Sequence, residues 1–276
     1  MIGQNALREN LSNLIELDRL PRFIILIGDY GSGRKLLAKW IATTANMPYV
    51  TSELGVDNIR QIIDVSYKTT LPTVYIIPNA NKLSTIAQNA LLKITEEPPN
   101  LAYFIITIEN GGQILPTLLN RGITFQMLPY TANELRLYLE QTYPTSKYHD
   151  ILIDICDTMG EMNDLMSYDI EEFLGFVDKV VVNISTASGA NAFRIADKIN
   201  LKDTESESGK GYDLSIFLKA FKAHCMNALM NDTSALKYAD GVVVTNKYLQ
   251  DLQRIRGVNK PMLFDAWLID VRKRWV

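Results

Sequence analysis

The chain has 276 residues, of which 47% are hydrophobic and 21% are charged, and its formal net charge is -3. This length and composition are typical of a folded protein with one to three domains, and they exclude an intrinsically disordered chain. The small net charge excludes a global attraction to nucleic acid or anionic membranes, so any such contact requires a local patch. Because no apolar run approaches the roughly 18 residues of a membrane span, and the first residues lack a secretory pattern, we expect a cytoplasmic protein without a membrane partner.

Cysteine and histidine are too scarce to build a metal centre. Cys156 and Cys225 are isolated in segments with helical patterns, which predicts two buried, reduced thiols and no disulfide. His149 and His224 are the two histidines of the chain, too few to form a Cys/His cluster that could hold zinc. We therefore expect no zinc site and no other metal site.

Residues 22–36 predict a buried strand, a glycine loop and the start of a helix, which is the layout of a phosphate-binding loop. The loop contains Gly28, Gly31, Gly33, Arg34 and Lys35. The phosphate-binding pattern requires lysine where Arg34 stands and a hydroxyl residue where Lys35 stands. The hydroxyl would bind Mg²⁺, whereas a lysine ammonium repels it. We predict a degenerate Walker A loop with no nucleotide cofactor; the alternatives are a purely structural turn and weak phosphate binding.

The next central strand ends without the acidic residues of a nucleotide-hydrolysing site. Thr73–Ile77 is a β-branched and aromatic run, followed by Pro78 and Asn79 where carboxylates should hold Mg²⁺ and orient water. Neither residue can do this, because proline has no side-chain ligand and an amide does not accept a proton as a carboxylate does. Thr85 and Gln88 predict a capping box at the start of the following helix.

Strands and helices alternate over the first 130 residues, which predicts an α/β domain with a doubly wound parallel sheet. From Thr131 onward the pattern is helical, with one helix expected at Tyr148–Met159 and a polar loop at Asp203–Asp213. We predict three domains: an α/β domain at 1–130, a helical lid at 131–202, and a helical collar at 203–276.

Four segments in order resemble motifs of bacterial and phage-type DNA polymerase III clamp-loader AAA+ subunits. The most specific is Asn89–Pro99, which is similar to the segment after the Walker B strand; Gly3–Gln4, Val56–Arg60 and Ile114–Gly122 resemble further motifs. The resemblance implies an AAA+ domain, a lid and an oligomerising collar. It also implies partners: other subunits of a hetero-oligomeric ring, a sliding clamp, and primed DNA through the complex.

Within the last of these segments, Arg121 matches the arginine of the family's Ser-Arg-Cys motif, while Asn120 and Gly122 replace its serine and cysteine. The resemblance implies that Arg121 acts in trans as an arginine finger in a neighbouring subunit's ATP site. It also places Thr107 at a sensor position. The second sensor's arginine is missing from Gly160–Asn163.

These departures are most like the ATPase-inactive delta-prime subunit, although its four-cysteine zinc module is absent from this sequence. We therefore predict a non-hydrolysing ring scaffold that is not itself an enzyme. One alternative is an active ATPase with an atypical loop, using Asp29 or Glu109 to hold Mg²⁺. The other is a DNA-binding accessory that keeps the fold without the ring. Separately, Lys82 and Lys93 are candidates for contacts with DNA phosphates inside a ring, and the basic stretch 272–274 is a candidate contact for nucleic acid or a partner; the alternative for each is a solvated side chain.

Overall fold

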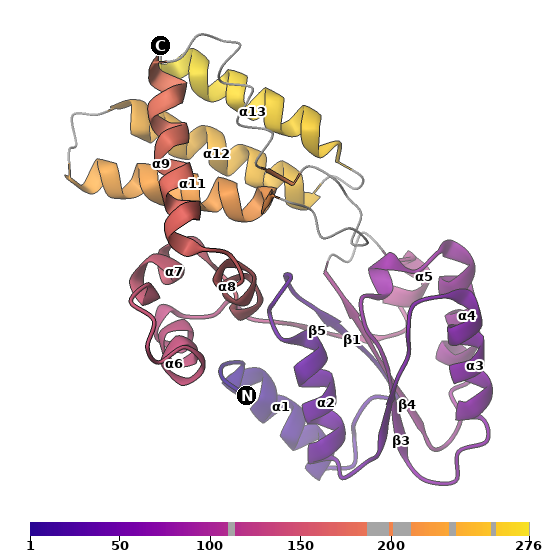
Figure 1. The fold of residues 1–276 in the computed structure, drawn as a ribbon. Helices are drawn as coiled ribbons and strands as arrows, with labels where there is room; N and C mark the ends of the chain where they lie inside the picture. Colours follow the sequence, from indigo (N-terminus) through magenta and orange to yellow (C-terminus); the bar gives the residue numbers. More distant parts are fainter. Residues whose placement is uncertain (110–113, 187–198, 201–210, 232–235, 255–257, 276) are drawn as a thin grey trace. The chain divides into compact units, whose positions relative to one another are not determined.

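The computed structural model describes residues 1–109, 114–186, 199–200, 211–231, 236–254 and 258–275 (Figure 1). The chain forms two compact units, one of residues 1–144 with 158–160, and the other of residues 145–157 with 161–276. The division into domains at 130 and 202 remains a prediction.

The first unit is built on a five-stranded sheet in which every pairing is parallel. In the spatial order β2-β3-β4-β1-β5, the strands are Tyr49–Thr51, Thr73–Ile77, Ala102–Ile108, Phe23–Ile27 and Ile123–Gln126. The apolar run of β1 pairs with strands on both sides, as expected for a strand covered by helices on both faces. The predicted α/β class with a parallel sheet is confirmed.

Helices cover both faces of this sheet (Figure 1). The helical elements of the first unit are α1 (Asn5–Glu16), α2 (Arg34–Thr44), α3 (Val56–Ser66), the 3₁₀ turn η1 (Ala80–Lys82), α4 (Thr85–Glu96), α5 (Pro116–Leu119) and α6 (Ala132–Thr142); α6 contributes no residue to the two cores that cover the sheet. Alternate side chains of β1 enter different cores: Phe23 and Ile25 pack with α3, α4 and α5, whereas Ile24 and Leu26 pack with α1 and α2.

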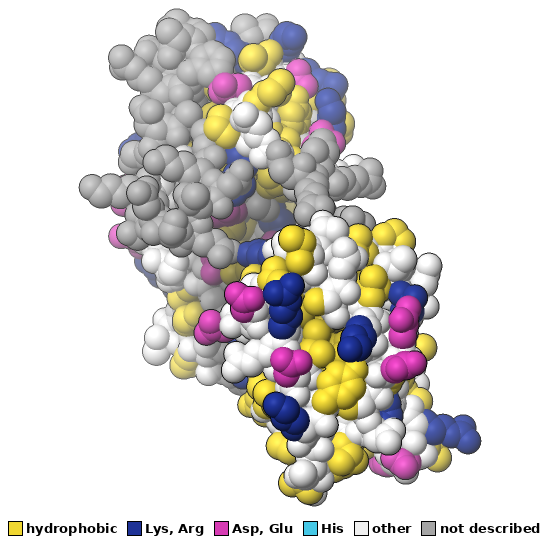
Figure 2. Space-filling view, turned by 90° about the vertical axis from the view of Figure 1, so that its right-hand side faces the viewer, with side chains coloured by type: hydrophobic (Ala, Val, Ile, Leu, Met, Phe, Trp, Pro, Cys, Tyr) yellow, Lys and Arg dark blue, Asp and Glu magenta, His cyan; other side chains and the backbone are white. Residues whose placement is uncertain are grey.

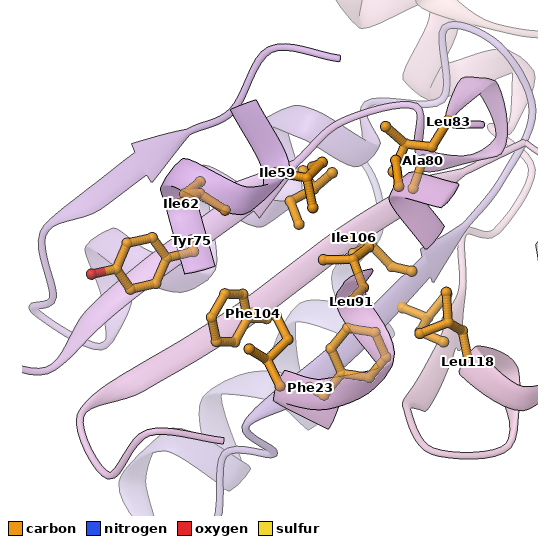
Figure 3. Close-up of a cluster of buried hydrophobic side chains, with 14 of the residues drawn as sticks. Phe23, Ile59, Ile62, Tyr75, Ala80, Leu83, Leu91, Phe104, Ile106 and Leu118 are labelled. Atoms are coloured by element: carbon orange, nitrogen blue, oxygen red, sulfur yellow. The ribbon is translucent and has the colours of Figure 1, made fainter. Parts of the chain in front are cut away.

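The core on the α3 and α4 face is shown in Figure 3, where Ile59 of α3 and Leu91 of α4 lie over the central strands. Tyr75 and Phe104, on neighbouring strands, stack with ring centroids 5.3 Å apart. Burying a side chain of this size contributes about 2 kcal/mol. This core therefore holds β1, β3 and β4 in place, and the candidate site residues follow the ends of these strands.

The second unit is mainly helical, with α7 (His149–Ile155), α8 (Met159–Met166), α9 (Ile170–Thr186), α11 (Leu214–Asn231), α12 (Leu236–Arg254) and α13 (Lys260–Trp275). An aromatic cluster forms its core, including Phe221 against Trp267 at 4.9 Å between ring centroids.

Cys156 and Cys225 are buried thiols, as predicted, and burial raises the pKa of each to about 12. None of the described helices is both long enough and apolar enough to span a membrane.

Three local predictions are wrong. The helix expected at Tyr148–Met159 ends at Ile155, and a second helix, α8, begins at Met159; between them the chain turns so that Thr158–Gly160 pack in the first unit. Tyr212–Asp213, expected in a loop, forms the short strand β7 beside β6 (Ile199–Asn200); residues 201–210 of that loop lie outside the described residues. The cap of α4 is Ser84, whose hydroxyl accepts a hydrogen bond from the backbone N–H of Ala87.

Candidate functional site

The glycine loop joins β1 to α2, and its shape requires glycine. A Cβ atom added to Gly28 would lie 2.6 Å from the Cβ atom of Met127, closer than two carbon atoms approach. Gly31 and Gly33 have φ angles of +74° and +87°, a conformation that residues with a side chain rarely adopt. These glycines are thus accounted for by local geometry, with or without a ligand.

Arg34, at the position of the usual lysine, is buried in an ion pair. Its Nη2 atom lies 3.1 Å from Oε1 of Glu109, just after β4, and the two side chains are 7% and 33% exposed. Its Nη1 atom and the hydroxyl of Ser32 are buried without a hydrogen-bond partner among the described residues. Lys35, by contrast, is exposed. The loop's buried cation is therefore already matched by a carboxylate of the same chain.

The ends of β3 and β4 are tied together by amide and hydroxyl groups. The backbone N–H of Asn79 donates to the hydroxyl oxygen of Thr107 at 3.0 Å, and the backbone N–H of Glu109 donates to the side-chain carbonyl of Asn81 at 3.3 Å. Thr107, the predicted sensor residue, is thus a hydrogen-bond acceptor for the turn after β3. Pro78 and Asn79 supply no carboxylate after β3, so these two positions offer a metal ion no anionic ligand.

Residues 158–160 pack directly on the glycine loop. The backbone N–H of Gly160 donates to the carbonyl of Gly31 at 3.3 Å. A Cβ atom added to Gly160 would lie 2.4 Å from the Cα atom of Gly31, so this approach is possible only between two glycines. The flanking residues Asp157 and Glu161 belong to the second unit, where each pairs with the buried Lys219 at 2.6 Å. The segment resembling the second sensor therefore contacts the loop through backbone atoms.

Tyr130, just before α6, also holds the loop. Its hydroxyl donates to the carbonyl oxygen of Ser32 at 2.8 Å. Burial, followed by the nearby Glu134 and Tyr138, raises the pKa of Tyr130 to about 12, because each disfavours the phenolate. The hydroxyl is therefore a neutral donor throughout the physiological range.

Arg121 lies on a different part of the first unit, after α5. Its Nη2 atom is 2.5 Å from Oε1 of Glu96, the last residue of α4, and its Nη1 atom is 3.5 Å from the carbonyl oxygen of Thr117. The side chains of Arg121 and Glu96 are 34% and 55% exposed. This guanidinium is thus on the surface, with a carboxylate of its own chain beside it.

The backbone around Arg121 is fixed by buried contacts. The side chain of Gln88, expected in a capping box, is buried and instead donates to the carbonyl of Leu83 and accepts from the backbone N–H of Leu115 at 2.9 Å. A Cβ atom added to Gly122 would lie 2.6 Å from Cδ1 of Ile25. A helix of only four residues is therefore held in place between α4 and the sheet.

The predicted phosphate-binding lysines, Lys82 and Lys93, are both exposed. In Figure 2, Lys and Arg side chains alternate with Asp and Glu and with hydrophobic patches on the face shown. At the end of α13, Arg274 pairs with Asp240 at 3.0 Å. A DNA-binding role for these residues stays a prediction.

The structure thus brings Arg34 together with Glu109, and Arg121 together with Glu96. Sequence reasoning named Glu109 only as a possible Mg²⁺ ligand, and it named no role for Glu96, Tyr130 or the contact of Gly31 with Gly160. The sequence signal for this contact was that both of its residues are glycine. Among the described residues, no group of histidines, cysteines and carboxylates is arranged to bind a metal ion.

Comparison with solved structures identifies the fold. The chain is similar to a gamma-subunit-related protein of DNA polymerase III from Thermotoga maritima, with a TM-score of 0.52 and 16% identity over 97% of this chain and 99% of that one. It is also similar to the RuvB Holliday junction branch migration motor of the same organism, with a TM-score of 0.50, 16% identity, and 96% and 88% of the two chains covered. The fold is AAA+.

Sequence comparison narrows the class. Residues 47–131 match the family described as DNA polymerase III, delta subunit. The chain is 26% identical over 235 residues to the gamma/tau subunit of Mycoplasma genitalium, covering 74% of this chain and 37% of that protein. It is 38% identical over 73 residues to the delta-prime subunit of Yersinia pestis, covering 25% and 22%. The chain therefore spans well under half the length of these curated relatives.

Over these parts of its length, the chain is therefore similar to AAA+ subunits of the DNA polymerase III clamp-loader family. The resemblance of Asn89–Pro99 and its companion motifs to that family is confirmed.

Proposed function

We propose that this chain is a non-hydrolysing subunit of a sliding-clamp loader in DNA replication, a ring scaffold that lends Arg121 to a neighbour's ATP site. Its partners would be the other subunits of a cytoplasmic hetero-oligomeric ring, the sliding clamp, and primed DNA reached through the complex. The similarity to clamp-loader subunits is the starting point. The delta-prime-like role is the part that we infer.

The observation that carries the proposal is the ion pair between Arg34 and Glu109 at 3.1 Å. A nucleotide phosphate at this loop would compete with a carboxylate that is already in contact with a buried guanidinium. Removing one partner from such a pair leaves the other charge uncompensated, which is unfavourable. Arg34, the cation of the loop that would otherwise bind phosphate, is therefore paired with a carboxylate of the same chain.

The surrounding groups support the same conclusion. Lys35 stands where Mg²⁺ needs a hydroxyl, and Pro78 and Asn79 stand where it needs a carboxylate. The alternative of an atypical ATPase needed Asp29 or Glu109 for the metal ion. Since Glu109 contacts Arg34, only the exposed Asp29 is left for that alternative.

Arg121 differs from Arg34 because its proposed role, in a neighbour's ATP site, does not require this chain to bind ATP. A planar guanidinium that reaches across an interface stabilises the charge on a transferred phosphoryl group, an effect of about 10³-fold or more in rate. Arg121 is one-third exposed and carried by a backbone held from both sides. Both properties suit a residue presented to a neighbour.

The first test is a titration of the purified chain with labelled ATP, with and without Mg²⁺, followed by an assay for turnover. We expect no saturable binding up to millimolar ATP and no hydrolysis, with the circular dichroism spectrum unchanged. The matched variant Lys35→Ala should behave identically, because Lys35 is exposed and has no role in this account. Mg²⁺-dependent turnover that Lys35→Ala abolishes would establish the atypical ATPase instead.

A further inference from the structure

Glu96 occupies a position that is unfavourable for a carboxylate. It is the last residue of α4, where the helix dipole presents partial negative charge. Lys93, one turn earlier, is the residue type that this helix end favours. Glu96 is also 55% exposed, so hydrophobic contact does not account for its position. Among the described residues, Glu96 forms an ion pair only with Arg121, whose positive charge offsets the carboxylate at this helix end.

The contact between Glu96 and Arg121 is built into one folded unit. Buried Leu91 and Ile94 fix the last turns of α4, while buried Leu118 fixes α5. These buried residues place the Nη2 atom of Arg121 2.5 Å from Oε1 of Glu96, although the two residues are 25 positions apart in the sequence. The second contact, from Nη1 to the carbonyl oxygen of Thr117, is at the long limit of hydrogen bonding at 3.5 Å. Glu96 is therefore the principal partner that sets the direction of the Arg121 side chain.

This pair is also easy to open. Ion pairs between half-exposed side chains contribute little to stability, because water solvates both charges when they separate. A phosphate group offers a guanidinium more negative charge and two oxygens in a bidentate arrangement, so it competes well with a single carboxylate oxygen. An approaching triphosphate can thus displace Glu96 without unfolding the segment.

We propose that Glu96 is a positioning residue for Arg121, a latch that holds the guanidinium against its own subunit until a neighbour's nucleotide phosphate replaces the carboxylate. The inference rests on the proposed trans role of Arg121 and adds its regulation. While the latch is closed, Arg121 is neutralised and turned toward α4, so a loosely assembled neighbour gains little from it. Closing of the interface exchanges one anion for another, and no bond is made or broken.

The latch itself is tested on the chain alone with phenylglyoxal, which modifies accessible arginines, followed by mass spectrometry of the peptides. In Glu96→Gln, which keeps the size and shape of the side chain, we expect modification of Arg121 to accelerate about two- to fivefold, the range expected for loss of a half-exposed ion pair. Glu97→Gln is the matched control and should leave the rate unchanged. Arg60, paired with Asp57 elsewhere in the unit, is the internal reference.

Salt provides a second readout that a merely structural role would not give. Raising the ionic strength weakens exposed ion pairs, so modification of Arg121 should accelerate in the wild type but much less in Glu96→Gln. Equal rates at Arg121 in the wild type, Glu96→Gln and Glu97→Gln would overturn the latch.

The regulatory consequence is tested in the complex reconstituted with the ATPase subunits of the same source. Glu96→Gln should raise the rate of ATP hydrolysis in the absence of clamp and DNA by about two- to fivefold. Glu96→Asp, which keeps the carboxylate, should raise this rate less. Glu97→Gln should leave it unchanged. If Arg121→Ala lowers hydrolysis while Glu96→Gln has no effect, the finger stands and the latch is overturned. If Arg121→Ala has no effect, the proposed function fails, whatever the modification rates show.

Discussion

The first unit contains two arginine–carboxylate pairs in different surroundings. Arg34 and Glu109 are 3.1 Å apart with side chains 7% and 33% exposed, whereas Arg121 and Glu96 are 2.5 Å apart with side chains 34% and 55% exposed. The shorter pair is the one that solvent screens more, so distance does not decide which is more firmly fixed. Burial does, because a charge left without its partner is destabilising in proportion to its isolation from water.

This difference separates a committed cation from an available one. Opening the pair at the glycine loop would leave a buried guanidinium uncompensated, while opening the surface pair exposes two charges to water. Arg34, in the glycine loop, is therefore committed to Glu109, whereas Arg121 on the surface can exchange its partner. Variants that perturb one of these regions while sparing the other test this contrast.

The largest effect on stability is expected from Gly31→Ala. The added Cβ atom would lie 2.4 Å from the hydroxyl oxygen of Thr158, at a φ angle of +74°, and strain with overpacking should lower the free energy of unfolding of the first unit by about 3 kcal/mol. Denaturant-dependent amide exchange in β1 and β4 measures this. Gly175→Ala in α9, where a Cβ atom meets nothing within 4 Å, is the control and should stabilise its helix by about 0.5 kcal/mol. An equal effect of both variants would contradict the close glycine contact.

A smaller loss is expected when the buried pair is broken. Glu109→Gln leaves the Arg34 guanidinium without its carboxylate, and we expect a loss of about 2 kcal/mol, less than for a fully buried pair because Glu109 is one-third exposed. The same amide-exchange measurement applies. Modification of Arg121 by phenylglyoxal should not change. A stability equal to that of the wild type would show that Arg34 is solvated.

Tyr130 gives a pH-dependent test of the loop. Its pKa is raised to about 12 in the folded chain, against about 10 when unfolded. The folded state therefore holds its proton more tightly, so the stabilisation is complete below pH 10 and is lost as the pH rises from 10 to 12. Tyr130→Phe should remove this part of the pH dependence. Spectrophotometric titration of phenolate absorbance measures it, and ionisation of Tyr130 near pH 10 would contradict the burial of its hydroxyl beside Glu134.

The smallest effect on stability is expected at the surface pair. Glu96→Gln should change the free energy of unfolding by less than about 0.5 kcal/mol, and Glu97→Gln should do the same. Urea denaturation compares the two variants. A loss of several kcal/mol in Glu96→Gln alone would mean that Glu96 is a structural residue, and the contrast between the two pairs would disappear.

The sequence predicted the architecture of the first unit because its signals are local. The apolar runs of β1 and β3, the glycines of the loop and the double proline after α4 each determine their own neighbourhood. Arg121 was found only through the resemblance of its surrounding segment, since a lone surface arginine has no distinguishing pattern.

The partners of the two arginines could not be predicted, because those contacts arise from tertiary structure. Glu109 is 75 residues from Arg34, and Glu96 is 25 residues from Arg121. No spacing rule connects residues at such distances. The error at Tyr148–Met159 has the same origin, since Gly160, at the start of α8, forms a backbone hydrogen bond with Gly31, far away in the sequence.

The most direct test of the central claim compares Arg121→Ala with Lys35→Ala in the reconstituted clamp-loader complex, measuring clamp- and DNA-stimulated ATP hydrolysis. We predict that Arg121→Ala lowers the rate at the neighbouring site by about 10³-fold without unfolding the chain, and that Lys35→Ala leaves hydrolysis unchanged. An unchanged rate in Arg121→Ala, together with a loss in Lys35→Ala, would contradict the account and make this chain an ATPase in its own right.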